Sequence, residues 1–270
     1  MIAHLINTDA GNRGTLRVYL DYRRNNPDFL RDSAKMLLDN YERVLIITGF
    51  PIPPTMRAET DGPPGALAIA RAVENLGGRA EVLTYQEVRE ALDRFHLSFV
   101  EGPDVSDYSL VVAVETPGRG KDGRYYSMTG AEITRGTFDR AILEARDAGI
   151  PTIGIGDGGN EAGMGKIREL VERHVPRGRK IASTVETDGL VLSAVSNWGA
   201  YGLVAQASLE FGRKLIPDWK EGEVIRTISR SGLIDGVTRN QTPTVDGISL
   251  RIHEGIVELL NALLEESMGG

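Results

Sequence analysis

The sequence predicts an α/β protein with a doubly wound, mostly parallel sheet and helices on both faces. Short, continuously apolar segments recur along the chain, and stretches with the helical spacing of apolar residues separate them. Unbroken apolar strands are typical of parallel sheets, which are covered on both faces. Parallel neighbours also need crossover connections, so the intervening helices are expected on both sides of the sheet.

The elements are predicted in order along the chain. The predicted strands are short apolar runs that end at glycine, proline or polar residues, and they cover 43–48, 79–84, 109–114 and 151–155. The predicted helices have apolar residues three or four positions apart, and they cover 32–41, 65–76, 86–95 and 137–148. Beyond Gly156 the pattern is less regular. It predicts helices at 164–174, 199–215 and 252–265, and extended segments at 181–185 and 190–195.

Length and composition indicate one folded domain. The chain has 270 residues, of which 41% are apolar and 26% charged, which supports a hydrophobic core and excludes disorder over the whole length. No Ser-rich or Pro-rich linker divides it, so we expect a single domain over 1–270, with the loops at 49–64 and 115–135 as lids or insertions. Cysteine is absent, which excludes disulfides, thiolate metal sites and a cysteine nucleophile.

The charge balance limits the partners that we expect. There are 31 Lys and Arg against 38 Asp and Glu, a net charge of −7, and no basic run is interleaved with aromatic residues, so nucleic acid is not an expected partner. The apolar runs are far shorter than the roughly 20 residues that span a bilayer, so no membrane partner is expected. The first nine residues lack the basic and apolar regions of a signal peptide, which favours a cytoplasmic location. The oligomeric state stays open.

Polar loops rich in glycine follow the predicted strands. Glycine accounts for 32 of the 270 residues, and glycines cluster beside acids and prolines. Such loops let the backbone bend sharply or approach a ligand closely. Ligands of open parallel sheets bind beyond the carboxyl ends of the strands. We therefore expect the loops 59–65, 115–118 and 156–166 to meet at one edge of the sheet, with Asp61 and Asp157 on the same side.

The loop after the fourth predicted strand favours a cation or proton transfer over a nucleotide. Its glycines fit the dinucleotide pattern G-x-G-x-x-G, but Asp157 and Glu161 would repel a pyrophosphate. The chain has neither a phosphate-binding G-K-[ST] sequence nor a G-x-S-x-G nucleophile elbow. Oxygen groups such as Asp157, Asn160 and Glu161 suit magnesium or manganese, whereas the four histidines are scattered without the spacing of zinc ligands. A metal-free, hydrogen-bonded loop is the alternative.

Several motifs together resemble the D-glutamate cyclase family. They are ETDGPPGA at 59–66, GDGGNE at 156–161, GMG at 163–165 and NWGAY at 197–201. The resemblance extends from DAGNRG at 9–14 to GVTR at 236–239 and TVDG at 244–247, which is most of the chain. It implies a lyase of D-amino acid metabolism that converts D-glutamate to 5-oxo-D-proline with loss of water. The chain resembles only the C-terminal portion of the longer eukaryotic members.

The implied reaction assigns roles to particular residues. A base must take a proton from the α-amine, and an acid or a cation must help an oxygen of the γ-carboxyl group to leave as water. The candidate catalytic acids are Glu59, Asp61, Asp157 and Glu161. Cationic, amide and backbone groups would bind the two carboxylates and the developing oxyanion, and the candidates are Arg13, Gly158, Gly159, Asn160, Lys166, Asn197 and Arg239. No cofactor is certain from the sequence, and Mg²⁺ or Mn²⁺ at Asp157, Asn160 and Glu161 is the candidate.

Two other functions fit the same observations. One is an enzyme that acts on a different small acidic amino acid or metabolite on the same scaffold, because a fold can keep its site and change its substrate. The other is a metabolite-binding module without catalysis. Trp198 either forms a wall of the site or packs in the core.

Overall fold

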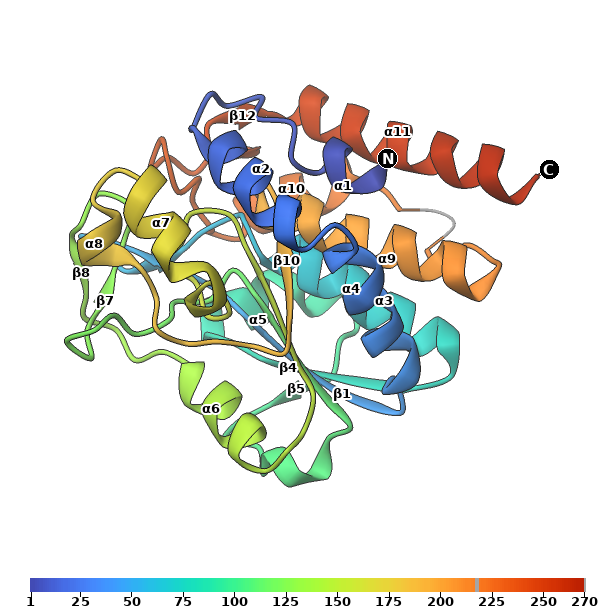
Figure 1. The fold of residues 1–270 in the computed structure, drawn as a ribbon, viewed down its shortest axis with the longest axis horizontal. Helices are drawn as coiled ribbons and strands as arrows, with labels where there is room; N and C mark the ends of the chain where they lie inside the picture. Colours follow the sequence, from blue (N-terminus) through green and yellow to red (C-terminus); the bar gives the residue numbers. More distant parts are fainter. Residues whose placement is uncertain (217–218, 270) are drawn as a thin grey trace.

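The centre of the protein is a parallel sheet of six strands. The computed structural model describes residues 1–216 and 219–269. The strands lie in the order β10-β9-β6-β1-β4-β5, and each neighbouring pair is parallel (Figure 1). Their bounds are β1 Arg43–Thr48, β4 Arg79–Leu83, β5 Phe99–Val100, β6 Leu110–Val114, β9 Thr152–Gly156 and β10 Gly189–Leu192.

Helices cover both faces of the sheet, as the sequence predicts. Helices α3 (Phe29–Asp39), α4 (Pro63–Leu76) and α9 (Ser196–Phe211) pack on one face, and α6 (Asp139–Asp147) packs on the other (Figure 1). The residues of β1 alternate between two apolar clusters. Val44 and Ile46 face the α3, α4 and α9 side, whereas Leu45 and Ile47 face the α6 side. Two buried faces explain why the strand is apolar at consecutive positions.

The other elements surround this layer structure. The remaining helices are α1 (Ile2–Leu5), α2 (Thr15–Asn25), α5 (Gln86–Leu92), α7 (Arg168–His174), α8 (Gly178–Ile181), α10 (Glu221–Arg230) and α11 (Leu250–Met268), with short 3-10 turns at Asp93–Phe95, Val105–Asp107 and Gly165–Ile167. Three antiparallel pairs lie outside the sheet: β2 (Pro51–Ile52) with β3 (Arg57–Ala58), β7 (Tyr125–Tyr126) with β8 (Glu132–Ile133), and β11 (Thr244–Val245) with β12 (Ile248–Ser249).

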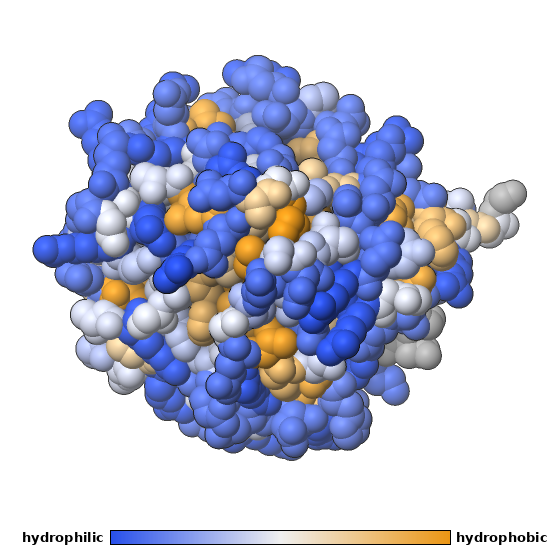
Figure 2. Space-filling model, turned by 90° about the horizontal axis from the view of Figure 1, so that it is seen from below, coloured by the Kyte–Doolittle hydropathy of each residue, from blue (hydrophilic) through white to orange (hydrophobic). Residues whose placement is uncertain are grey.

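The surface is largely hydrophilic. Figure 2 shows one face of the protein, on which apolar residues lie in separate areas among polar ones. Large apolar side chains that are exposed within residues 1–216 and 219–269 are Met1, Leu16, Leu20, Phe211, Val237, Ile252 and Leu259. In the same residues, no helix combines the length and the apolar character that crossing a bilayer requires.

Most of the predicted elements are confirmed within a few residues, and one is wrong. The strand predicted at 43–48 has these bounds in the structure, but the segment predicted as extended at 181–185 forms no strand. Ile181 ends α8, and the Val185 carbonyl accepts bonds from the backbone N–H of Gly163 (2.8 Å) and Gly165 (3.0 Å). The segment therefore supports the loop after β9 and does not extend the sheet. Helices α1, α2, α8 and α10 were not predicted.

Two side chains cap each other's helices at the carboxyl edge of the sheet. The Asp61 carboxylate accepts hydrogen bonds from the Ser196 and Asn197 N–H groups, at 2.9 and 2.8 Å, in the first turn of α9. The Asn197 Oδ1 atom accepts from the Gly62 and Gly65 N–H groups, at 3.0 and 2.9 Å, at the start of α4. Each side chain thus accepts from N–H groups at the start of the other helix, where these groups have no carbonyl partner within the helix.

This mutual cap fixes the approach of α4 and α9. A Cβ atom at Gly65 would lie 2.8 Å from the Ala200 Cβ atom, so glycine permits the contact between the two helices. The Asn197 Nδ2 atom donates to the Thr60 carbonyl at 3.2 Å, so the whole Asn197 amide is engaged in this structure. Asn197 does not line the cavity described below, and neither does Trp198, which is buried and donates from its indole to His253 (2.8 Å).

Replacing Asn197 with Ala should strongly destabilise the protein. The change leaves the buried N–H groups of α4 and the Thr60 carbonyl without partners, so we expect the free energy of unfolding to fall by about 2–4 kcal/mol. Urea unfolding measures it. The control is Asn25→Ala, an exposed asparagine in α2, which should change the free energy by less than about 0.5 kcal/mol. Equal effects of the two variants would contradict the capping role.

Candidate active site

A cavity of about 670 Å³ lies where the loops after the central strands converge. Its walls come from segments that are far apart in the sequence. They include residues 12–17, then Phe50, Ile52, Pro53 and Glu59 after β1, Glu115 after β6, Ser127–Thr129 of the β7–β8 hairpin, the loop after β9, residues 174–177, and parts of the segment 236–246. The position agrees with the rule that ligands of parallel sheets bind at the carboxyl ends of strands.

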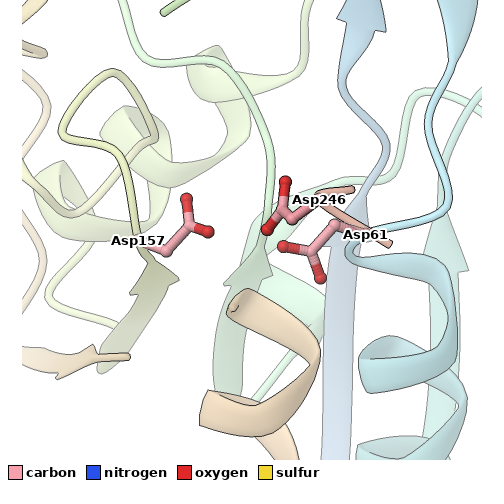
Figure 3. Close-up of side chains that lie close together, drawn as sticks. All are labelled: Asp61, Asp157 and Asp246. Carbon is pink, nitrogen blue, oxygen red and sulfur yellow. The ribbon is translucent and has the colours of Figure 1, made fainter. Parts of the chain in front are cut away.

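Buried carboxylates lie at the inner end of the cavity, where Asp157 and Asp246 line it and Asp61 lies beside them without lining it. Oxygen atoms of Asp61, Asp157 and Asp246 lie within 4.8 Å of one another, and Figure 3 shows the three side chains directed toward a common space. Asp157 directly follows β9, Asp61 precedes α4, and Asp246 lies in the turn between β11 and β12. The prediction that Asp61 and Asp157 meet at one edge of the sheet is confirmed.

A second set of carboxylates shares Asp157 with the first. Oxygen atoms of Glu115, Asp157 and Glu161 also lie within 4.8 Å of one another, and all three residues are buried. The Ser196 hydroxyl, at the start of α9, donates to the Glu115 carboxylate at 2.6 Å. The capped end of α9 therefore holds an acid of each set, Asp61 through backbone N–H groups and Glu115 through a hydroxyl.

Arg13 is the cation of the inner cluster. Its Nη1 atom pairs with the Asp157 carboxylate at 2.7 Å and also with Asp246. Burial alone would lower the pKa of Arg13, but the carboxylates of Asp157, Asp246 and Asp61 raise it above its ordinary value, so the guanidinium keeps its charge. One guanidinium cannot balance three ionised carboxylates at this distance. The cluster therefore holds protons near neutral pH.

Burial raises the pKa values of several acids that line the cavity and of Asp61 beside it. The pKa of Asp61 rises to about 8, because burial disfavours the charged form and the Asp246 carboxylate repels it. Burial likewise raises the pKa of Asp157 to about 7, although Arg13 acts in the opposite direction. The pKa values of Glu59, Glu115 and Asp246 are also raised, mainly by burial, with repulsion from neighbouring carboxylates adding to the effect. Asp61 and Asp157 therefore titrate near neutral pH, and the other three acids hold their protons more strongly than a surface carboxyl group does.

The loop after β9 is built around Glu161. Its carboxylate accepts hydrogen bonds from the Gly158 N–H at 2.8 Å and from the Gly159 N–H at 2.7 Å. Gly159 has φ of +108°, and a Cβ atom there would lie 2.3 Å from Val171, so this position requires glycine. Glu161 thus shapes the loop as well as lining the cavity.

The buried carboxylates could bind a divalent metal ion, and the two sets differ in their surroundings. Arg13 already pairs with two of the three acids in the Asp61–Asp157–Asp246 set. No cation within the described part of the chain pairs with Glu115 or Glu161. Beside this second set, Asn160 donates from Nδ2 to the Tyr126 carbonyl at 2.7 Å, and its buried Oδ1 atom has no partner in residues 1–216 and 219–269. Such an orphaned oxygen fits a hard cation.

Two acids of the site, Glu115 and Asp246, were not among the candidates from the sequence. Glu115 directly follows the apolar strand β6, and this position was the available signal. Asp246 lies in the 244–247 motif, but far from every predicted strand. Both residues have positive φ, +44° and +56° respectively, a backbone conformation that L residues rarely adopt and that often occurs at functional sites.

The other predicted site residues have varied positions. Glu59 lines the cavity beside Gly236, where a Cβ atom would lie 1.9 Å from the Glu59 Oε2 atom. Gly158 and Asn160 line the cavity, and Arg239 lies at its exposed mouth. Lys166 lies outside it, where its ammonium donates to the Asp188 carbonyl.

The fold and the site define a parallel α/β protein with a carboxylate-rich cavity at the carboxyl edge of its sheet. The chain belongs to the D-glutamate cyclase-like family, whose C-terminal domain model matches residues 2–261. It is 34% identical over 236 residues to the human protein named D-glutamate cyclase, mitochondrial. The match covers 74% of this chain and 37% of the human protein, so the chain corresponds to well under half the length of that relative.

Two solved structures show a more distant likeness. One is RecJ from Thermus thermophilus in complex with Mn²⁺, with 12% identity and a TM-score of 0.39 over 76% of this chain and 24% of that one. The other is an exonuclease RecJ bound to manganese, with 13% identity and a TM-score of 0.40 over 88% of this chain and 46% of that one. Likenesses of this degree support no inference about the chain.

Replacing Arg13 with Met should cost more stability at high pH than at low pH. At pH 6 the cluster holds its protons with or without the guanidinium, whereas at pH 9 Asp61 and Asp157 of the wild type, with pKa values of about 8 and 7, ionise beside Arg13. In the variant the pKa values of the folded acids lie above those of the wild type, whereas the acids of the unfolded chain are fully ionised at both pH values. The free energy of unfolding of the variant therefore falls further as the pH rises. We expect an additional loss of about 1–2 kcal/mol at pH 9, since one pKa unit corresponds to about 1.4 kcal/mol.

Urea unfolding at pH 6 and pH 9 tests this expectation. Arg17→Met is the matched control, because Arg17 lines the same cavity but is exposed and forms no ion pair within the described residues. Its effect on stability should be the same at both pH values. A pH-independent cost of Arg13→Met would show that Arg13 does not set the protonation of the cluster.

Proposed function

We propose that this chain catalyses the cyclisation of D-glutamate to 5-oxo-D-proline with release of water. Membership of the D-glutamate cyclase-like family supports the reaction. The observation that carries the proposal is the cavity of buried acids, in which the pKa of Asp157 is about 7 and burial raises the pKa values of Glu59 and Asp246 well above their ordinary values. Cyclisation needs both an ionised and a protonated carboxyl group at neutral pH, and these acids provide the two forms together.

The reaction divides between a base and an acid. The neutral α-amine attacks the γ-carboxyl carbon and forms the C–N bond of the ring. Asp157, half ionised near its pKa of about 7, accepts the proton that the nitrogen loses. An acid whose pKa burial raises further, Glu59 or Asp246 on the cavity wall, donates a proton to the departing oxygen. The departing oxygen takes its second proton from Asp157, which passes on the one it received from the nitrogen. The C–O bond then breaks and water leaves, so that only the donating acid is left ionised and atoms and charge balance.

Mg²⁺ or Mn²⁺ is the cofactor that we propose for the site. Glu115 and Glu161 would hold the ion, the unpartnered Asn160 Oδ1 atom adds a third oxygen, and the neighbouring Asp157 stays free to act as the base. A bound ion would polarise the γ-carboxyl group and stabilise the negative charge that develops on it. The protein's own contribution to that charge is the backbone N–H of the loop after β9, with Gly158 on the cavity wall.

Turnover measurements test the proposal directly. The protein is incubated with D-glutamate or L-glutamate in the presence of Mg²⁺ or Mn²⁺, and the products are separated by chiral chromatography. Formation of 5-oxo-D-proline from D-glutamate is expected. Its absence under all these conditions would overturn the proposal and leave another acidic metabolite or a non-catalytic binding role.

Asp157→Asn should lower kcat by about 100-fold or more, because general-base catalysis contributes 10²- to 10⁴-fold. Glu169→Gln is the control, since Glu169 is exposed on α7 and should leave kcat unchanged. Glu161→Gln should lower the melting temperature along with kcat, because a Gln amide cannot accept both glycine N–H bonds. An Asp157→Asn variant with near wild-type turnover would exclude Asp157 as the base.

Mn²⁺ should bind more tightly as the pH rises. The ion binds ionised carboxylates and must displace the protons that burial keeps on the site, where the pKa of Glu115 is raised well above its ordinary value and that of the neighbouring Asp157 is about 7. Calorimetry from pH 6 to pH 9 should show an affinity that rises by up to about tenfold per pH unit for each proton released and then levels off. Glu115→Gln should weaken binding and Glu169→Gln should not. Binding that depends on neither pH nor Glu115 would place the ion elsewhere.

A further inference from the structure

We propose that the outer part of the cavity is an oxyanion subsite, in which Arg17, Arg177 and the first turn of α2 bind a carboxylate or phosphate group of the ligand. The inner part then holds the reacting end of the same molecule. The identity of the group rests on the proposed function: for D-glutamate it is the α-carboxylate. The subsite itself rests on the charges and contacts of the cavity mouth.

The cavity has opposite charges at its two ends. Its inner end is acidic, whereas three arginines line the mouth, Arg17 in α2, Arg177 before α8 and Arg239 after α10. All three are exposed, and none forms an ion pair or a side-chain hydrogen bond with a residue that the structure describes. Other arginines, such as Arg230 and Arg251, also pair with no carboxylate among the described residues, but they do not line the cavity. Unpaired arginines from three separate segments around one cavity leave their donors to a ligand.

The N-terminal end of α2 adds backbone donors to this mouth. The Asp9 carboxylate accepts from the Arg13 N–H at 2.7 Å and from the Gly14 N–H at 2.8 Å, which fixes the turn before the helix. No side chain in residues 1–216 and 219–269 caps α2, so the N–H groups of Thr15, Leu16 and Arg17 have no protein acceptor. The start of an 11-residue helix with free N–H groups favours an anion.

Thr15 gives an independent indication of a missing partner. The residue is about nine-tenths buried and lines the cavity, yet its hydroxyl forms no hydrogen bond within the described residues. A buried hydroxyl without a partner is costly and uncommon. An oxyanion at the first turn of α2 would supply the acceptor that Thr15 lacks.

The two ends of the cavity are close enough for one small ligand. Arg13 pairs with Asp157 and Asp246, and Gly14 and Thr15 follow it directly in the chain. The cavity of about 670 Å³ also has room for both groups. The ten heavy atoms of D-glutamate, taken at the roughly 30 Å³ of a water molecule in the liquid, fill less than half of it.

Binding of two unreactive acids tests the subsite apart from turnover. Glutarate has two carboxylates and no amine, so it cannot cyclise, and butyrate lacks one of the carboxylates. Calorimetry in Mg²⁺ buffer should show about tenfold weaker binding of glutarate to Arg17→Ala and to Arg177→Ala, with butyrate unchanged. Arg230→Ala, an exposed arginine of α10 that does not line the cavity, is the control and should bind both acids as the wild type does.

Inorganic phosphate identifies the source of the oxyanion. If glutarate binding is unaffected by the arginine variants but wild-type binding of phosphate is lost in them, the subsite belongs to a phosphate-bearing ligand. If neither anion depends on Arg17 or Arg177, the subsite is overturned.

Thr15→Val gives a readout that a purely structural role would not produce. Removing an unpartnered buried hydroxyl should raise the melting temperature and still weaken glutarate binding by a few-fold. A variant with unchanged glutarate affinity would remove Thr15 from the subsite.

Failure of the proposed function is a separate result: no turnover of D-glutamate, together with arginine-dependent glutarate binding, rejects the reaction and keeps the subsite.

Discussion

The mutual capping of α4 and α9 by Asn197 and Asp61 is the interaction on which the site depends. It joins the segment after β1 to the segment after β10 with four hydrogen bonds of 2.8 to 3.0 Å between side chains and backbone N–H groups. Since Asp61 is held by this cap, its carboxylate has a fixed position beside Asp157 and Asp246. Ser196 extends the same support to Glu115. The N-terminal end of α9 thus fixes the position of one acid in each carboxylate set, Asp61 in one and Glu115 in the other.

The excess of buried carboxylates over cations determines the chemistry of the cavity. Burial, and then repulsion between the carboxylates that Arg13 compensates only in part, raises the pKa values of Asp61 and Asp157 to near neutrality. A surface carboxylate would be fully ionised at that pH. The protein therefore gains proton-exchange groups by burying acids, and the cost of that burial is offset by backbone N–H donors at Asp61 and Glu161.

The sequence predicts the sheet better than it predicts the site. The strands 43–48 and 109–114 are recognisable because both of their faces are buried. Their residues are therefore apolar at consecutive positions, and this run is visible in the sequence. Asp61 and Asp157 could be placed together from the direction of parallel strands alone. Asp246 could not, because it reaches the cavity through the turn held by Asp235, whose carboxylate accepts from the Val237, Thr238 and Gly247 N–H groups. Asn197 was predicted to bind substrate because its motif identifies the residue but does not show that its side chain hydrogen-bonds to the backbone at the start of α4.

Strand direction also explains how so many acids can share one edge of the sheet. In a parallel sheet the helices that follow the strands begin at the carboxyl edge, so their positive N-terminal ends meet there. Asp61 lies between two such ends, those of α4 and α9, and accepts N–H groups from both. The start of α2 lies at the cavity mouth with free N–H groups. Helix N-termini therefore stabilise negative charge at both ends of the cavity. At the inner end the Asp61 carboxylate accepts the free N–H groups, and at the mouth the N–H groups of α2 are left for a ligand.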